Sequence, residues 1–462
     1  MPLSVEKMKS NDPSTFHRNA MIDGDGFSAL FFQKVLPMSD FQLSRRDLLA
    51  TTAVASATAA FAVPTFVPRT VMAQGRRPGA NDRVVIGCVC AGGRARLLME
   101  NIPEDGQLVA LADANFPRAI EYQKARNADW DLYGSHWPIL NRKDIDAVII
   151  TGQEFQRIYP CIHACEAGKD VYAEKPLTLY VQEGRTLINC VRKHKTVFQV
   201  GTQQRSMGMN RVACEFVRNG GLGKIRYVQA VNYTGMGPSN TNMGSGTMAP
   251  GFNWDLHLNQ GAWHEYNLGW INGRNFYGGE MTNWGAHGID QLQWALGKDH
   301  TLPVDFMPLS EGYDGKVATR YADGTELRFE LPTNGPIGGG IITGEKGRLE
   351  INRNKFTSNP VEIAGELVKK VDEKEEALKW DETIAAKWHI QNWIDCIRSR
   401  ELPNSDVETG ANSIAVCHLV NITRWMGRQL KFDPVKERFI NDDEANSWVD
   451  RPRRKGYELP DY

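Results

Sequence analysis

Apolar residues in the first half of the chain follow two alternating patterns. Continuous runs rich in β-branched residues predict buried strands at 83–89, 108–112, 146–151, 171–173 and 197–200. The stretches between these runs carry apolar residues at helical spacing and predict helices through 97–99 and at 116–127, 158–167 and 181–194. Strands that alternate with helices in this way predict an α/β domain over residues 82–204, built on a doubly wound parallel sheet.

The pattern changes after about residue 205. Further strands are predicted at about 225–233, 316–322, 325–331, 337–343 and 347–352, and further helices at 283–296, 385–399 and 406–429. Ala322-Asp323-Gly324 is typical of a β-hairpin turn, and residues 234–280 are expected to form a long irregular segment. We therefore predict a second domain of the α+β class over residues 205–440, with an open, mainly antiparallel sheet, and a tail over residues 441–462.

The N-terminal extension, residues 1–74, is excluded from the fold. Arg45 and Arg46 open a weakly apolar stretch that ends in a small-x-Ala sequence at Ala73, which resembles a twin-arginine export signal. The stretch contains Pro64 and is too polar for a transmembrane helix, so we expect no stable membrane anchor. We expect export to the periplasm. A disordered tail on a cytoplasmic protein is the alternative, and Met38 is a second candidate start.

Composition narrows the possible partners. The chain has 462 residues, and its 54 basic residues nearly balance its 55 acidic ones, which gives no field that favours nucleic acid. The short charged runs 369–374 and 451–455 are expected to be solvated surface. Eight cysteines spread over so long a chain predict buried free thiols rather than a disulfide framework. His257 and His264 have no third ligand at a matching spacing, so no metal site is predicted.

The turn after the first strand carries a glycine pattern that is typical of dinucleotide binding. In the register G-x-G-x-x-G/A the second glycine is Gly92, whereas the first position is Cys90. Gly93 and Arg94 follow at the start of a helix, where backbone N–H groups can bind a pyrophosphate. Asp113 ends the second strand, where a carboxylate can accept hydrogen bonds from a ribose diol, which favours NAD over NADP. A glycine turn that only packs a helix on a sheet is the structural alternative.

A resemblance to a known family rests on this turn and on four further segments: Ala167–Pro176, which ends in Glu174-Lys175-Pro176, and Gly278–Asp290, His389–Arg400 and Asp406–Gly410. Together they resemble the Gfo/Idh/MocA oxidoreductase family, the glucose-fructose oxidoreductase and inositol dehydrogenase group, in an exported, planctomycete-type branch. The resemblance covers about residues 82–450. It implies an N-terminal Rossmann domain, NAD as cofactor with NADP less favoured, a sugar or polyol substrate, and a homo-oligomer formed through the C-terminal sheet.

The resemblance also assigns the chemistry. Lys175 would lie beside the nicotinamide and the substrate hydroxyl, where loss of solvent lowers the pKa of an ammonium group and suits it to proton transfer. The family's Asp-x-x-x-His motif falls on Asn283 and His287, which share one face of a helix. Asparagine can bind a hydroxyl but cannot accept its proton. His287 is therefore the second acid–base candidate, and Asn283 and Asp290 are the expected substrate contacts.

The remaining cofactor contacts that the resemblance implies are Thr151, Gln153, Glu174, Lys175, Pro176 and Gln203. The family's Thr-Pro-x-His/Tyr-x-His segment reads Thr151-Gly152-Gln153-Glu154-Phe155-Gln156 here. Departures at Cys90, Gln153–Gln156 and Asn283 leave two hypotheses. The chain is an NAD(P)-dependent oxidoreductase with a retained, recycling cofactor, or a catalytically degenerate relative that binds sugar or nucleotide without turnover.

Tryptophans gather in and after the irregular segment, at positions 254, 263, 270, 284 and 294. Their aromatic faces suit stacking on a carbohydrate. They also suit a second purpose, which is to pack a long loop against the sheet, and the sequence favours neither reading.

The export hypothesis predicts the fate of the extension. Replacing Arg45 and Arg46 by lysine is expected to leave the protein unprocessed in the cytoplasm, because the twin-arginine pathway reads both guanidinium groups. Cell fractionation with immunoblotting measures this. Arg76 and Arg77, which follow the expected cleavage site, provide the matched lysine control. Normal processing of the Arg45/Arg46 variant would contradict the hypothesis.

Overall fold

The computed structural model describes residue 79 and residues 82–238, 246–266, 269, 273–371 and 382–462. The predicted export signal and Trp270 lie outside the described residues. No helix in the described part of the chain is both long enough and apolar enough to cross a bilayer. All eight cysteines lie within the described residues as free thiols, as predicted, and seven of them are buried.

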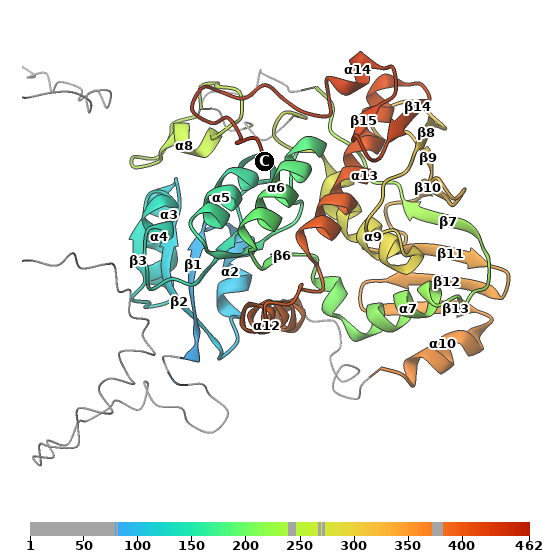
Figure 1. Ribbon diagram of the computed structural model, residues 1–462, viewed down its shortest axis with the longest axis horizontal. Helices are drawn as coiled ribbons and strands as arrows, with labels where there is room; N and C mark the ends of the chain where they lie inside the picture. The colour runs from blue at the N-terminus through green and yellow to red at the C-terminus, as the bar shows by residue number, and fades with distance from the viewer. Residues whose placement is uncertain (1–78, 80–81, 239–245, 267–268, 270–272, 372–381) are drawn as a thin grey trace, which may run out of the picture. The chain divides into compact units, whose positions relative to one another are not determined.

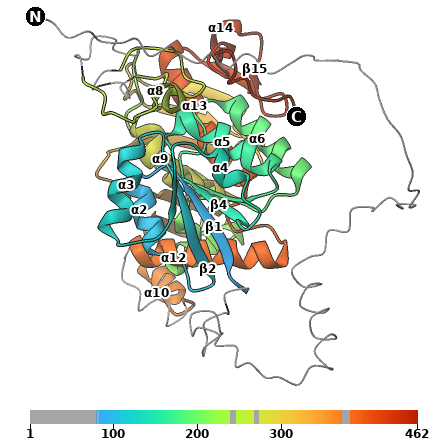
Figure 2. The ribbon, with the colours of Figure 1, turned by 90° about the vertical axis from the view of Figure 1, so that its left-hand side faces the viewer.

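The first sheet is parallel and has the strand order β3-β2-β1-β4-β5-β6 within the described chain (Figures 1 and 2). Its strands are β1 Val84–Val89, β2 Gly106–Ala112, β3 Asp131–Tyr133, β4 Ala147–Ile150, β5 Asp170–Ala173 and β6 Phe198–Val200. The order reverses between β1 and β4, and a crevice for a ligand opens at the carboxyl ends of the strands at such a point. The predicted doubly wound parallel sheet is confirmed.

Helices cover both faces of this sheet. They are α2 Gly93–Glu100, α3 Phe116–Ala125, α4 Trp137–Leu140, α5 Glu154–Glu166, α6 Val181–His194 and, from far along the chain, α12 Glu382–Ser399. Successive side chains of β4 point to opposite faces, so Ile149 packs in a cluster with α2 and α12, and Ile150 packs in a cluster with α5 and α6. Ile390 and Trp393 of α12 belong to the first of these clusters.

The second sheet has the order β13-β12-β11-β7-β10-β9-β8-β14-β15. Its strands are β7 Ile225–Val231, β8 Asp305–Pro308, β9 Val317–Arg320, β10 Glu326–Leu331, β11 Gly340–Gly344, β12 Gly347–Asn352, β13 Lys355–Asn359, β14 Leu430–Asp433 and β15 Arg438–Phe439. Of the pairings described here, β7 with β10 is parallel and the others are antiparallel. The predicted open, mainly antiparallel sheet and the hairpin between β9 and β10 are confirmed.

The remaining helices are η3 Gln203–Ser206 (a 3-10 helix), α7 Gly208–Arg218, α8 Trp254–Leu258, α9 Glu280–Leu296, α10 Val361–Val368, α13 Val407–Met426 and α14 Asp443–Asn446. The central one is α13, which packs against α6 of the first domain and α9 of the second. Small residues allow this approach, because a Cβ added at Gly410 would lie 2.5 Å from Val200 and one added at Gly184 would lie 3.2 Å from Ala411. One continuous hydrophobic core therefore joins the two domains.

Several parts of the fold differ from the sequence analysis. The segment 234–280, expected to be irregular, contains the short helix α8, and α7 was not predicted although Val212, Ala213 and Val217 form a buried face on it. Helix α12 falls in the range predicted for the second domain but packs on the first sheet. The predicted domain limits themselves stay predictions.

Candidate active site

The turn from β1 to α2 keeps a glycine conformation although its first key residue is not glycine. Cys90 has φ +73°, in the left-handed region that costs a non-glycine residue about 1–2 kcal/mol. Its N–H donates to the Ala112 carbonyl at 2.7 Å, and the Thr151 hydroxyl donates to its carbonyl at 2.8 Å. Burial, followed by the nearby Asp113 carboxylate, raises the pKa of the Cys90 thiol to about 12, so it stays protonated.

The start of α2 leaves room for a ligand. Gly92 is the N-cap of this helix, and no described side chain caps the free N–H groups of its first turn. A Cβ added at Gly92 or Gly93 would meet no described atom within 4 Å. Free backbone donors beside open space at a helix N-terminus fit the pyrophosphate of a dinucleotide.

A cavity of about 290 Å³ lies beside this turn, at the carboxyl ends of β1, β2 and β4. It is lined by five of the residues predicted to bind the cofactor: Cys90, Gly92, Asp113, Thr151 and Gln153. The Asp113 carboxylate accepts the N–H of Ala91 at 2.6 Å and the N–H of Asn115 at 2.7 Å, and burial raises its pKa. Because each carboxylate oxygen has a second lone pair, Asp113 can brace the turn and still accept a ribose hydroxyl.

A second group of predicted residues meets at the ends of β5 and β6. Arg94, at the start of α2, donates to the buried Glu174 carboxylate, with 2.8 Å between Nε and Oε1. The Gln203 amide, oriented to satisfy its neighbours, donates to the Gly201 carbonyl and accepts from Arg94. The Lys175–Pro176 peptide bond is cis. The contacts of Arg94 with Glu174 and with Gln203 fix the end of β5 from which Lys175 projects.

Lys175 extends from the first domain to helix α9 of the second. Its ammonium Nζ donates to Asn283 Oδ1 at 2.7 Å and to the Asn283 carbonyl at 3.1 Å. Burial lowers the pKa of Lys175 to about 8, since the favourable charge of Glu174 is opposed by Arg94, Arg353 and Arg157. At neutral pH a useful fraction of this lysine is therefore a free amine that can accept a proton.

His287 lies one helical turn after Asn283. Burial lowers the pKa of His287 well below its usual range, and the positive charges of Lys175 and Arg353 act in the same direction. Within the described residues its Nδ1 has no hydrogen-bond partner. His287 is thus a neutral imidazole with a free nitrogen, suited to a hydrogen bond with a substrate hydroxyl.

The Asn283 amide is held in one orientation. Its Nδ2 donates to Glu280 Oε2 at 3.1 Å, and Tyr277 donates its hydroxyl to Glu280 Oε1 at 2.8 Å. The amide oxygen therefore faces Lys175. A neutral oxygen at this position, in place of the family's carboxylate, holds the lysine without stabilising its charged form as an ion pair would.

Glu154 is a site residue that the sequence analysis did not single out. It is the first residue of α5, is buried, and accepts hydrogen bonds from the Gly278 N–H and from the Thr282 hydroxyl at 3.5 Å, just before α9 and in its first turn. Its Oε2 has no partner among the described residues. Burial raises the pKa of Glu154 to about 7, although Lys175 is near enough to oppose this. It occupies the first His/Tyr position of the family segment, a register that could have identified it.

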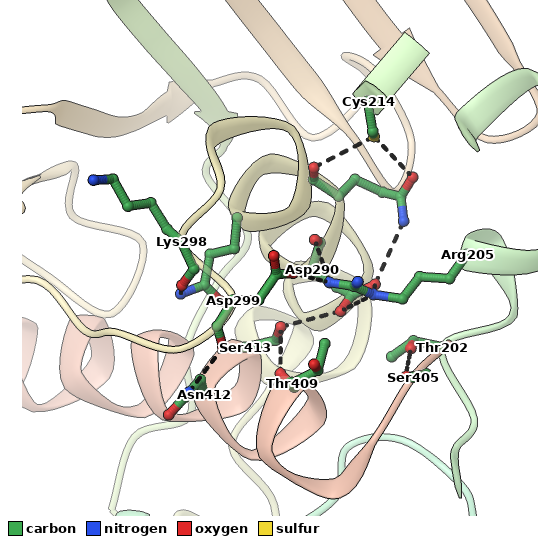
Figure 3. A network of polar contacts seen from close by, with 12 residues as sticks. Thr202, Arg205, Cys214, Asp290, Lys298, Asp299, Ser405, Thr409, Asn412 and Ser413 are labelled. Carbon is green, nitrogen blue, oxygen red and sulfur yellow. Dashed lines mark hydrogen bonds and ion pairs between the residues drawn. The ribbon is translucent and has the colours of Figure 1, made fainter. Parts of the chain in front are cut away.

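Asp290 is not brought to the site, which corrects its prediction as a substrate contact. Its carboxylate is fully buried and lies 2.9 Å from Arg205 Nε, and Arg205 also pairs with Asp299 at 2.7 Å (Figure 3). Ser413 of α13 donates to Asp290 at 3.1 Å. This network joins η3, α9 and α13, so Asp290 stabilises the helix that carries His287.

The structure shows the packing role for one tryptophan, and stacking on a carbohydrate stays a prediction for the others. Trp284 lies at the site, with Lys175 Nζ 6.0 Å and Arg353 Cζ 5.6 Å from its ring centroid. Trp254 is buried in an aromatic cluster and packs the loop. Trp263 is 57% exposed, so it is available to solvent.

Comparisons with known proteins agree with this arrangement. Residues 82–202 match a family model described as oxidoreductase family, NAD-binding Rossmann fold, and residues 239–459 match one described as oxidoreductase family, C-terminal alpha/beta domain. The predictions of the family resemblance and of an NAD-binding domain are confirmed.

Curated relatives match over part of their own length. The chain is 27% identical to 2,7-anhydro-N-acetylneuraminate hydratase of Mediterraneibacter gnavus, over 27% of this chain and 32% of that protein. It is 29% identical to inositol 2-dehydrogenase/D-chiro-inositol 3-dehydrogenase of Halalkalibacterium halodurans, over 26% and 35%. The chain thus spans about a third of the length of these relatives.

Solved structures share the fold. The WlbA dehydrogenase from Bordetella pertussis, in complex with NADH and UDP-GlcNAcA, has a TM-score of 0.57 and 17% identity over 77% of this chain and 99% of that one. The aldose-aldose oxidoreductase from Caulobacter crescentus has a TM-score of 0.53 and 17% identity over 76% and 100%.

The Cys90 turn yields a prediction. Cys90→Gly is expected to be more stable than Cys90→Ala by about 1 kcal/mol, because both lose the thiol but only glycine removes the cost of positive φ. Cys90→Gly should also bind NAD more tightly than the wild type. Denaturant unfolding and calorimetric titration measure the two effects. Equal stability of the two variants would show that the turn is not strained at this residue.

Proposed function

This chain belongs to the Gfo/Idh/MocA oxidoreductase family, and from this we propose that it is an NAD-dependent oxidoreductase acting on a sugar or polyol. The reaction would transfer a hydride between a carbinol carbon and the nicotinamide. The observation that carries the proposal is the position of Lys175, held by Asn283 next to His287 at the carboxyl ends of the dinucleotide-binding strands, with a pKa lowered by burial to about 8.

The residues around the substrate divide the work as follows. When bound, NAD supplies a hydride acceptor. The neutral Lys175 amine would take the proton of the reacting hydroxyl, and Asn283 would keep that amine in place. His287 would orient the same hydroxyl through a hydrogen bond, since a neutral imidazole can either donate or accept one. The names of two curated relatives, an inositol dehydrogenase and an anhydrosugar hydratase, support a polyhydroxylated substrate.

We propose NAD rather than NADP because the Asp113 carboxylate faces the cavity. A ribose diol can donate to this group, whereas a 2′-phosphate would be repelled by its charge. Thr151, Gln153, Glu174, Pro176 and Gln203 are proposed as further contacts or supports of the cofactor, together with the turn residues Gly92, Gly93 and Arg94.

The alternative is a degenerate relative that binds sugar or nucleotide without turnover, and Asn283 in place of the family's aspartate favours it. Mass spectrometry of the denatured, purified protein detects retained NAD(H). Nicotinamide absorbance or labelled-hydride exchange across sugars, polyols and glycosides then detects turnover. A protein that holds NAD(H) but stays inactive on every substrate would support the alternative.

Location and assembly are also proposals. Twin-arginine export transports folded proteins, so an exported enzyme would carry its cofactor with it and recycle it between substrates. Association of copies through the second sheet is the proposed assembly. On this sheet, strand β10 carries polar side chains. Arg328 pairs with Glu326 at 2.5 Å, and Glu330 accepts a hydrogen bond from Gln229 of β7 at 2.8 Å.

Removing the amine should abolish most turnover. Lys175→Ala is expected to lower kcat by roughly 10²-fold or more, the scale of lost general base catalysis, while NAD stays bound. Steady-state kinetics and the NAD content of the purified variant measure the two quantities. Lys431→Ala, at an exposed lysine of β14, is the control and should keep the wild-type rate. A Lys175→Ala enzyme with near wild-type kcat would remove Lys175 from the reaction.

Restoring the family's carboxylate should change the pH profile. In the oxidation direction activity rises with pH as Lys175 loses its proton, near pH 8 in the wild type. Asn283→Asp is expected to move this limb upward by about 1 pH unit or more, since a carboxylate beside the ammonium favours its charged form. Asn283→Ala removes the hydrogen bond without adding charge and should not raise the limb. An unmoved or lowered limb in Asn283→Asp would contradict the assignment.

A further inference from the structure

The dinucleotide cavity has an outer wall that comes from the second domain. Phe252, Leu256, His257, Asn259 and Tyr266 line the same cavity as the Rossmann turn residues. They all belong to residues 246–266, a segment that includes α8 and that we call the roof. In Figure 1 the roof helix α8 lies beyond the ends of α3 and α5, on the side where the strands of the first sheet end.

The roof is hydrogen-bonded to the first domain on two sides of the cavity. On one side the Asn253 N–H donates to the Ala114 carbonyl at 2.8 Å, and Phe252 forms a β-bridge with Asn115. On the other side Asn259 Nδ2 donates to the Gln156 carbonyl at 3.2 Å. These contacts lie directly after Asp113 and in the first turn of α5, so the roof spans the mouth of the crevice.

Aromatic packing gives the roof a fixed shape. The rings of Trp254 and His257 stack with centroids 5.3 Å apart and 18° between their planes, and Phe252 contacts both rings edge-on. Trp254 is buried against Phe155 and Tyr180 of the first domain. The roof is therefore a preformed wall rather than a loose loop, because such burial removes large apolar surfaces from water.

The C-terminal tail holds the roof from outside. In Figure 1 the red tail runs from α14 to α8. Arg454 Nη1 donates to Asp255 Oδ1 at 2.6 Å and its Nε donates to the Asn259 carbonyl at 2.9 Å. One guanidinium group therefore forms hydrogen bonds at both ends of α8. Tyr457 donates its hydroxyl to Asp255 Oδ2 at 2.8 Å.

The tail is itself fixed to the first domain. Arg451 donates to the Phe155 carbonyl at 2.8 Å and to the fully buried Glu183 carboxylate at 3.1 Å. Arg453 donates to Gln260 of the roof at 3.1 Å. The prediction that the run 451–455 is solvated surface is therefore wrong for its three arginines, whose side chains are between 6% and 17% exposed. Lys455 is exposed.

We propose that the roof, held by the C-terminal tail, is part of the cofactor site and retains bound NAD between turnovers. This rests on the proposed function, since it assumes that the dinucleotide occupies the cavity. A dinucleotide that lies between the Rossmann turn and the roof would be covered by the roof on its outer side, so loosening the roof is expected to speed its release. A single substitution at Arg454 can remove the hydrogen bonds to Asp255 and Asn259 without altering any residue that lines the cavity.

The experiment measures the release of NAD from the full-length purified holoprotein. Wild type and Arg454→Ala are loaded with NAD, diluted into NAD-free buffer and passed over gel filtration at set times, and the retained NAD is determined by enzymatic cycling. Arg454→Ala is expected to release NAD about 10-fold faster or more, the factor that corresponds to the loss of a charged hydrogen bond. Arg320→Ala, which removes an exposed guanidinium paired with Glu326 on the second sheet, should release NAD at the wild-type rate.

Two further variants guard against a folding defect. Tyr457→Phe and Asp255→Asn weaken the hydrogen bonds between the tail and α8 with smaller changes of side chain. They are expected to speed the release of NAD less than Arg454→Ala does. If the wild type holds and releases NAD but all three variants release it at the wild-type rate, the retention proposal is overturned while the proposed function stands. If the wild type neither carries NAD nor binds it when it is added, the proposed function fails and the retention proposal fails with it.

Discussion

The hydrogen bond from the Lys175 ammonium to Asn283 connects the two domains at the point where chemistry would occur. It requires the end of β5, in the first sheet, to stay in register with helix α9 of the second domain. That register is fixed by α13, which packs on α6 and α9 with glycine at its tightest contact, against Val200. It is fixed again by the buried ion pairs of Arg205 with Asp290 and Asp299. Removing one partner of a buried pair of this kind is strongly destabilising, because it leaves an uncompensated buried charge.

Two of the three departures from the family motifs change the charge near the start of α9. Position 283 has lost a carboxylate, and position 154 has gained one on the other side of the start of α9. Glu154 binds the backbone there rather than the lysine, so Lys175 is left with a neutral partner and a lowered pKa. Cys90, in contrast, changes no charge and preserves the backbone path of the glycine it replaces. The departures at positions 283 and 154 therefore change the charge near Lys175, whereas the departure at position 90 does not.

Local patterns in the sequence were sufficient for most of the first domain. Buried parallel strands are continuous apolar runs, and each such run from 83 to 200 became a strand within a few residues of its predicted limits. What the sequence could not show depends on distant partners. Asp290 follows His287 at a spacing that suggests a shared site, but Arg205, on a 3-10 helix with no pattern of its own, binds its carboxylate. Likewise, Arg451 pairs with Glu183, which lies far earlier in the sequence, and a run of basic residues gives no sign of such a partner.

The position of helix α12 shows that the first sheet depends on a distant part of the chain. It comes from the far end of the chain, yet its Ile390 and Trp393 cover the face of the first sheet that presents Ile86, Ile149 and Tyr172. A fragment that ended at residue 204 would expose this face to water, and apolar surface of that extent favours aggregation. The nucleotide-binding half is therefore expected to depend on α12 to cover one face of its sheet, and this cover becomes available only after the C-terminal part of the chain has been synthesised.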